Sequence, residues 1–96
     1  MPVYGVAQIR IDDREGYGRY EAAFMPIFQK YGGELVAVDD APKLVEGDPD
    51  ITRVVILRFA DEASFDRWYD SDEYQEIAKH RLASSTATLV RAKGFV

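Results

Sequence analysis

The sequence has no cysteine and only one histidine in its 96 residues. Without cysteine there can be no disulfide, no thiolate zinc site and no cysteine-ligated iron–sulfur cluster. A single histidine is also too few for a histidine-rich metal centre within one subunit. We therefore expect a protein without a metal site and without a cofactor.

Long hydrophobic runs and clusters of basic residues are missing too. No stretch approaches the roughly 18 apolar residues that a membrane-spanning helix needs. The N-terminus, MPVYGVAQIRIDD, lacks the basic and long apolar regions of a signal peptide. The formal net charge is -5 and basic residues are scattered singly, so no basic patch would follow a phosphate backbone. These absences predict a cytoplasmic protein that binds neither membranes nor nucleic acid.

What is present is the composition of one globular domain. Hydrophobic residues make up 47% of the sequence and charged residues 30%, which is ordinary for a chain that forms a core. The length is close to that of a typical single domain. We expect one domain over residues 1–96, whose partner is a small molecule or another protein.

The first third of the sequence predicts a strand followed by a helix. Residues 3–11 are rich in β-branched and aromatic types, and Tyr4, Val6, Gln8 and Arg10 share one face of this strand. A helical period then begins after Asp13, a plausible N-cap, and ends at the glycine pair 32–33. The apolar stripe of this helix comprises Tyr17, Tyr20, Phe24, Ile27, Phe28 and Tyr31. Pro26 lies inside the helix and predicts a kink.

The rest of the sequence predicts three more strands and a second helical segment. The strands are residues 34–38, 52–60 and 86–92. A long loop joins the first two of these, and residues 43–46 within it could form a short extra strand. Asp61 is expected to cap the second helical segment. Asp70 and Glu73 resemble a capping box that restarts it.

The order strand, helix, strand, strand, helix, strand predicts an α+β fold of the ferredoxin-like kind, βαββαβ with a four-stranded antiparallel sheet. Two helical segments can cover only one face of this sheet. The other face carries Val6 and one of two sets from residues 52–60: either Val54 and Ile56, or Val55, Leu57 and Phe59. Because an exposed apolar sheet face is unfavourable in a monomer, we expect a homodimer that buries the helix-free face.

Several residues, taken together, resemble a known family over nearly the whole chain. They are Asp13 with Tyr17 and Tyr20, Tyr31-Gly32-Gly33, Glu46-Gly47, Phe59, Trp68-Tyr69, Ser71-x-x-Tyr74-Gln75, Arg81 and Gly94. The sequence is similar to the domain of unknown function 1330 family, in the dimeric α+β barrel superfamily. The resemblance implies the fold and the dimer, and no established reaction.

The sequence also departs from the pattern that this family leads us to expect. Glu34 stands where an arginine is expected, Val38 and Asp39 stand where an arginine or glycine is expected, and Arg58 stands where an acid is expected. The charges of Glu34 and Arg58 are thus exchanged. If the strands 34–38 and 52–60 pair antiparallel, these two residues should be cross-strand neighbours and form an ion pair.

Candidate functional residues come from the second helical segment. His80 is either a surface histidine near a helix end or a proton-transfer group. Arg81 shares the inward face with Tyr74 and Ile77, where a guanidinium needs a partner. That partner is either a carboxylate such as Glu46 or Asp13, or the carboxylate or enolate of a substrate.

The aromatic residues complete the predicted site. Their hydroxyl and indole groups cannot all remain unsatisfied in a small core, so they either reach the surface or line a cavity. We expect Tyr20, Glu46, Trp68 and Tyr74 to bind a ligand, and His80 and Arg81 to be the catalytic residues if there is a reaction. The acidic residues around Glu46 do not have the spacing of a calcium loop.

Three functions remain open from the sequence. The first, common among relatives of the barrel, is a cofactor-free enzyme acting on a small aromatic or carbonyl-containing metabolite. The second is a binding or sensing module without chemistry, and the third is a purely structural dimer. The fold alone does not distinguish them.

Overall fold

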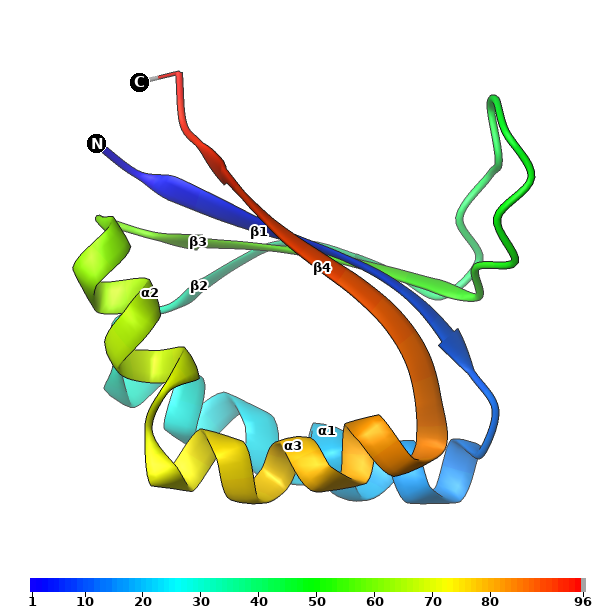
Figure 1. Cartoon of the computed structure of the whole chain (residues 1–96), viewed down its shortest axis with the longest axis horizontal. Helices are drawn as coiled ribbons and strands as arrows, with labels where there is room; N and C mark the ends of the chain where they lie inside the picture. Colours follow the sequence, from blue (N-terminus) through cyan, green and yellow to red (C-terminus); the bar gives the residue numbers. More distant parts are fainter. Residues whose placement is uncertain (96) are drawn as a thin grey trace.

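The computed structural model describes residues 1–95 and shows a four-stranded antiparallel sheet with three helices on one face (Figure 1). The elements are β1 (Val3–Ile11), α1 (Arg14–Lys30), β2 (Glu34–Asp39), β3 (Arg53–Phe59), α2 (Glu62–Tyr69), α3 (Asp72–Ser84) and β4 (Ser85–Lys93). The strand order is β2-β3-β1-β4. This confirms the ferredoxin-like prediction, with the second helical segment divided into α2 and α3 and the sheet left open at both edges.

Burial alternates along β3 and identifies the two faces of the sheet. Arg53, Val55, Leu57 and Phe59 are buried beneath the helices, whereas the residues between them are only half-buried. This alternation decides the choice that the sequence left open, because Val54 and Ile56 are the residues on the helix-free face.

Side chains at the helix starts fix where the helices begin. The Gly16 amide donates to Asp13 Oδ1 over 3.2 Å and the Ser64 amide donates to Asp61 Oδ1 over 2.7 Å, so both predicted N-caps are confirmed. The predicted capping box at Asp70 is wrong. Ser71 is the N-cap of α3 and accepts a hydrogen bond from the Tyr74 amide. Asp70 instead ends α2, since its amide still bonds within that helix.

A cluster of aromatic rings joins the helices to the sheet. Phe28 on α1 packs edge-on against Phe59 of β3, with ring centroids 5.4 Å apart. Trp68 of α2 contacts both rings and also lies 4.3 Å from the Tyr74 ring of α3. Such aromatic pairs stabilise the fold beyond the burial of their large apolar surfaces. The cluster therefore fixes all three helices against β3.

The chain reverses between α1 and β2 at Gly32, whose φ of 85° is the left-handed conformation that glycine adopts readily. This confirms the predicted end of the first helix. Pro26 is exposed within α1, which continues past it to Lys30. Further along the sheet, Glu34 is opposite Arg58 in the register, and Arg58 Nη1 lies 3.2 Å from Glu34 Oε1, so the predicted ion pair is confirmed.

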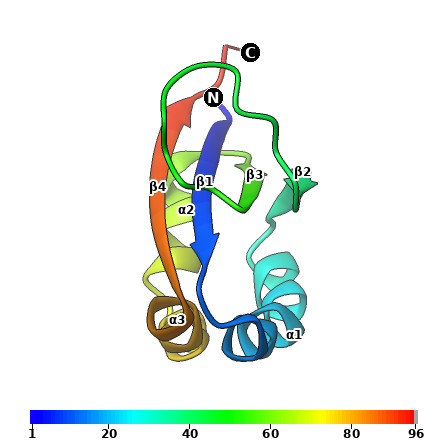
Figure 2. The ribbon, with the colours of Figure 1, turned by 90° about the vertical axis from the view of Figure 1, so that its right-hand side faces the viewer.

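The segment 40–52 between β2 and β3 is an irregular loop that projects to the helix-free side of the sheet, as Figures 1 and 2 show. The short strand considered for residues 43–46 is not formed there. Leu44 and Val45 are 51% and 85% exposed, so no strand of the described chain covers them. Within residues 1–95, no helix is long and apolar enough to cross a membrane.

Candidate functional site

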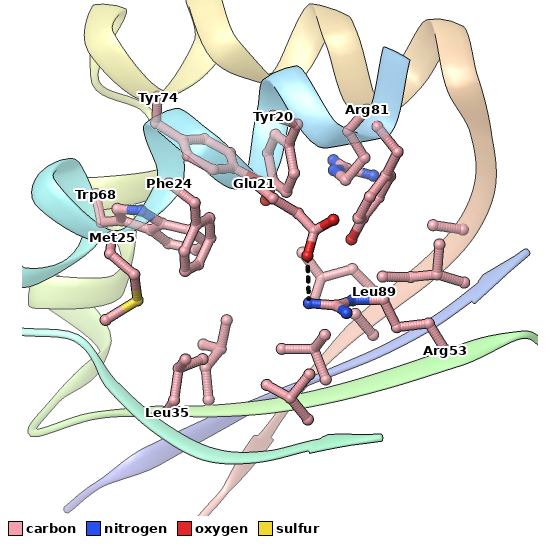
Figure 3. Close-up of a pocket in the computed structure, with 17 residues that line it drawn as sticks. Tyr20, Glu21, Phe24, Met25, Leu35, Arg53, Trp68, Tyr74, Arg81 and Leu89 are labelled. Carbon is pink, nitrogen blue, oxygen red and sulfur yellow. Dashed lines mark hydrogen bonds and ion pairs between the residues drawn. The ribbon is translucent and has the colours of Figure 1, made fainter. Parts of the chain in front are cut away.

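A cavity of about 150 Å³ lies between the helices and the sheet (Figure 3). Its volume is several times what one buried water needs. Side chains of α1, α2 and α3 form one wall, and side chains of all four strands form the other. Leu35 and Val38 of β2 are exposed members of this lining, so the cavity reaches the surface beside the edge strand.

Helical spacing places an aromatic wall on one side of the cavity. Tyr17, Tyr20 and Phe24 follow one another at intervals of three and four residues and therefore share one face of α1. The hydroxyls of Tyr20 and Tyr74 lie 2.8 Å apart and are hydrogen-bonded. One hydroxyl donates a hydrogen bond to the other, so the hydroxyl that accepts can still donate its own hydrogen to a further acceptor.

Burial sets the protonation of these tyrosines. It raises the pKa of Tyr20 well above its usual range, and the adjacent Tyr74 hydroxyl acts in the same direction. Burial also raises the pKa of Tyr17, although the positive charge of Arg53 opposes it. Both phenols are therefore neutral at physiological pH and act as hydrogen-bonding groups.

Arg81 brings a positive charge to this aromatic wall. It is 9% exposed, belongs to α3 two turns after Tyr74, and its guanidinium carbon is 5.8 Å from the centre of the Tyr20 ring. Arginine stays charged in proteins. No carboxylate among residues 1–95 lies within ion-pair distance of it, so the contact with the Tyr20 ring is the interaction that offsets its charge.

Neither protein carboxylate considered for Arg81 pairs with it. Asp13 is occupied as the N-cap of α1, and Glu46 lies exposed in the loop 40–52 on the far side of the sheet. Helical periodicity gives no information about long-range contacts. The sequence could therefore not identify which carboxylate, if any, lies beside Arg81. The structure leaves the inward face of Arg81 open to the cavity (Figure 3).

Arg53 is a second buried arginine on the cavity lining, and it was not among the site residues predicted from the sequence. It is 8% exposed, and its guanidinium carbon lies 5.6 Å from the centre of the Tyr17 ring. Its Nη2 is 3.3 Å from Glu21 Oε2 on α1, and its Nη1 is 2.6 Å from Asp40 Oδ1. The available signal was strand periodicity, because Arg53 is in phase with the inward-facing Val55 and Leu57.

Two buried donors around the cavity have no acceptor. Within the described chain, neither Arg53 Nε nor the indole nitrogen of Trp68 has a hydrogen-bond partner, and both atoms are buried. Leaving a buried donor unpaired costs on the order of 1–3 kcal/mol. Together with Arg81, these residues bring several donors to the cavity lining, where Glu21 is the one carboxylate among residues 1–95.

The structure therefore brings together four of the six predicted site residues. Tyr20, Trp68, Tyr74 and Arg81 line the same cavity. His80 is exposed on the outer face of α3 and Glu46 is exposed in the loop, and neither borders the cavity. Helical geometry accounts for His80, because adjacent residues on a helix point about 100° apart and Arg81 takes the inward position. No cluster of metal-ligating side chains is found among residues 1–95.

Comparison with known proteins identifies the family. The model of the domain of unknown function (DUF1330) matches residues 2–95. The chain belongs to the DUF1330 family. No curated protein matches the sequence significantly. The family match agrees with the resemblance seen in the glycine pair 32–33, Trp68-Tyr69 and Arg81.

Solved structures share the fold of this DUF1330 chain. A protein of unknown function from Rhodopseudomonas palustris, RPA0582, is 24% identical, with a TM-score of 0.86, and the match covers 99% of this chain and 83% of that one. SnoaB, a cofactor-independent oxygenase from Streptomyces nogalater, is 20% identical over 99% and 94% of the chains, with a TM-score of 0.69. A dimeric ferredoxin-like protein of unknown function from Jannaschia sp. CCS1 is 15% identical over 98% and 100%, with a TM-score of 0.71.

Proposed function

We propose that the cavity binds a small, flat and weakly acidic molecule, an aromatic acid or an enolic carbonyl compound, with Arg81 holding its negatively charged oxygen. The observation that carries this proposal is the buried charge of Arg81, which no carboxylate among residues 1–95 neutralises. A buried charge without a counterion is costly unless a ligand supplies one.

The surroundings of Arg81 support a flat ligand. The rings of Tyr20, Phe24, Trp68 and Tyr74 border the cavity and offer apolar contact to a planar molecule. The hydroxyl pair of Tyr20 and Tyr74 offers one further donor beside Arg81. An acceptor oxygen on the ligand would therefore meet a charged and a neutral donor together.

A cofactor-free reaction is the second candidate. Arg81 would stabilise an enolate oxygen that forms on a bound carbonyl compound, as oxyanion-binding groups do. The fold shared with the cofactor-independent oxygenase SnoaB is consistent with such chemistry, but at 20% identity it supports the fold alone. Binding is the better-supported function, because the neutral tyrosines bordering Arg81 donate hydrogen bonds and are poor bases.

Trp68 provides a direct test of binding. It is the only tryptophan in the sequence and it borders the cavity, so its fluorescence should report occupancy. We expect benzoate to change this emission in a saturable way, and the neutral analogue benzamide to bind at least about tenfold more weakly because it lacks the charge that Arg81 pairs with. Calorimetry gives an independent affinity.

The decisive variant is Arg81→Met, which keeps the length of the side chain but removes its charge and donors. We expect it to lose the preference for benzoate over benzamide. Arg19→Met is the matched control, because Arg19 is exposed on α1 and does not border the cavity. A folded Arg81→Met protein that still prefers benzoate as strongly as the wild type does would refute the proposal.

We also propose that the protein is a homodimer joined through the helix-free face of the sheet. Val6, Ile56 and Val90 are neighbours in the register across β1, β3 and β4, and they form an apolar row on this face. The loop 40–52, which carries the exposed Leu44 and Val45, projects to the same side of the sheet (Figure 1). A second copy packed on this face would bury the apolar row together with Leu44 and Val45. A dimeric ferredoxin-like protein from Jannaschia has the same fold.

A further inference from the structure

We propose that Arg53 is a second anion-binding residue of the cavity, so that the molecule bound there carries two acidic or strongly accepting oxygen groups. One group pairs with Arg81 and the other takes the place of Glu21 on Arg53. This inference rests on the proposed function, because it names the class of ligand for the same cavity.

The position of Arg53 is the first argument. β3 contributes Arg53, Val55, Leu57 and Phe59 to the helix-facing side, and Arg53 is the only charged member of that series. Arginine is seldom fully buried unless it is paired, because removing its charge from water costs free energy. Its guanidinium borders the cavity from the sheet, opposite the helix layer that carries Arg81 (Figure 3).

The hydrogen bonding of Arg53 is the second argument. Its Nε and Nη2 form the edge of the guanidinium that suits the two oxygens of a carboxylate. Glu21 uses only half of this edge, since Oε2 lies 3.3 Å from Nη2 while Nε is buried without a partner in the described chain. Asp40 lies on Nη1, outside this edge. A ligand carboxylate would satisfy both Nε and Nη2.

The mobility that this exchange requires is available. The Glu21 side chain is 36% exposed, so it can turn into water at little cost when a ligand takes its place. Asp40 keeps its contact with Nη1 of Arg53, so the arginine remains anchored to the start of the loop 40–52. Glu21 therefore acts as an internal substitute for the second acidic group of the ligand.

The test compares benzoate with the three benzenedicarboxylates, in which the second carboxylate is placed at increasing distance from the first. We expect at least one of the three to bind the wild-type protein about tenfold more tightly than benzoate. Glu21→Gln removes the negative charge that competes for Nη2 and should increase this advantage severalfold. Glu15→Gln removes the same charge from an exposed site on the same helix, and it should leave the advantage unchanged.

Arg53→Met should abolish the advantage of the dicarboxylate while benzoate still binds in its Arg81-dependent way. If Arg53→Met does not fold, the comparison of Glu21→Gln with Glu15→Gln still tests whether a ligand carboxylate binds Arg53 in place of Glu21. The inference is overturned if no dicarboxylate binds more tightly than benzoate to either the wild type or Glu21→Gln. It is also overturned if Glu21→Gln and Glu15→Gln show the same affinity advantage for the dicarboxylate. Benzoate binding that depends on Arg81 would then leave the proposed function intact, whereas loss of benzoate binding would refute that function first.

Discussion

Two arginines face one cavity, and the protein compensates their charges differently. Arg53 has carboxylates at 3.3 and 2.6 Å, while Arg81 has the Tyr20 ring and no carboxylate among residues 1–95. The protein itself therefore balances most of the charge of Arg53 in the absence of a ligand. The environment of Arg81 is typical of a group whose counterion arrives with a ligand. A ligand-binding Arg81 and a purely structural Arg81 predict opposite effects of its removal on stability.

Arg81→Met should therefore make the ligand-free protein more stable. Methionine fills similar space in an apolar site, and the cost of holding an uncompensated charge out of water is removed. We expect the free energy of unfolding, measured by urea denaturation, to rise by about 1 kcal/mol. A loss of stability of similar size would instead show that the contact with the Tyr20 ring is structural and that Arg81 contributes to the fold.

The raised pKa of Tyr20 predicts sensitivity to alkali. Tyrosine in the unfolded chain ionises near pH 10, whereas burial keeps Tyr20 protonated to higher pH in the folded protein. Above about pH 10 the unfolded state therefore binds fewer protons than the folded state, and stability falls as the pH rises. Below that pH the contribution of Tyr20 is fully present.

The measurement is the free energy of unfolding between pH 8.5 and 11. Tyr20→Phe should flatten the alkaline decline by up to about 1.4 kcal/mol per pH unit, leaving the part due to Tyr17, whose pKa is also raised by burial. Tyr4→Phe, which removes a hydroxyl from the opposite face of the sheet, is the control. An unchanged slope in Tyr20→Phe would contradict the burial assigned to that hydroxyl.

At the scale of elements, the junction of α1 and β2 depends on the close approach of Gly33 to Phe28. A methyl group at Gly33 would overlap the Phe28 ring, and that ring cannot move because it is fully buried against Phe59 and Trp68. By contrast, a methyl group at Gly18 within α1 would meet nothing within 4 Å. The same substitution should thus have opposite effects at the two sites.

We expect Gly33→Ala to lower the free energy of unfolding by about 1–3 kcal/mol through overpacking. Gly18→Ala should raise it by about 0.5–1 kcal/mol, because alanine restricts the unfolded chain and favours the helix. Thermal or urea denaturation of both variants provides the comparison. A neutral Gly33→Ala would mean that Phe28 can repack, contrary to its contacts with the aromatic cluster.

Local signals in the sequence account for the elements and for residues on the helical side of the cavity wall. Asp13, Asp61 and Gly32 act at the helix ends because capping depends on neighbouring residues only, although the same reasoning chose Asp70 where Ser71 is the cap. Periodicity likewise placed Tyr20, Tyr74 and Arg81 on inward faces. What it could not supply was the pairing of side chains between helix, loop and sheet.

Arg53 illustrates this limit most clearly. Its inward phase on β3 was readable, but Glu21 and Asp40 come from a helix and a loop that are separated from it by 32 and 13 residues in the sequence. The prediction that Glu46 lies with the other site residues was wrong because the direction of its loop could not be predicted. Its place in the long loop 40–52 gave no information about the side of the sheet to which that loop projects (Figure 1).

At the scale of the whole molecule, the two faces of the sheet have different roles. The inner face holds the cavity and the aromatic cluster, while the outer face presents an apolar row to solvent. Ile56 is one of the two middle members of this row, because the register pairs it with Val6 of β1 on one side and with Ala37 of β2 on the other. Val90, next to Val6, is 53% exposed.

A charge at the centre of this row should prevent the proposed dimer without disturbing the cavity. Ile56→Glu would place an unpaired carboxylate within the buried interface, and we expect it to weaken association by about a hundredfold or more. Multi-angle light scattering should then show a monomer at micromolar concentrations at which the wild type is a dimer. Circular dichroism should be unchanged, because the side chain of Ile56 faces away from the helices.

Ala22→Glu is the matched control, since it adds the same charge at an exposed position of α1, away from the proposed interface. It should remain dimeric. The cavity lies on the opposite face from Ile56, so the Ile56→Glu monomer should also keep the response of Trp68 to benzoate. A wild-type protein that is monomeric, or an Ile56→Glu protein that stays dimeric, would show that the helix-free face is not the interface. A monomer that no longer binds benzoate would show that the partner subunit helps to complete the site.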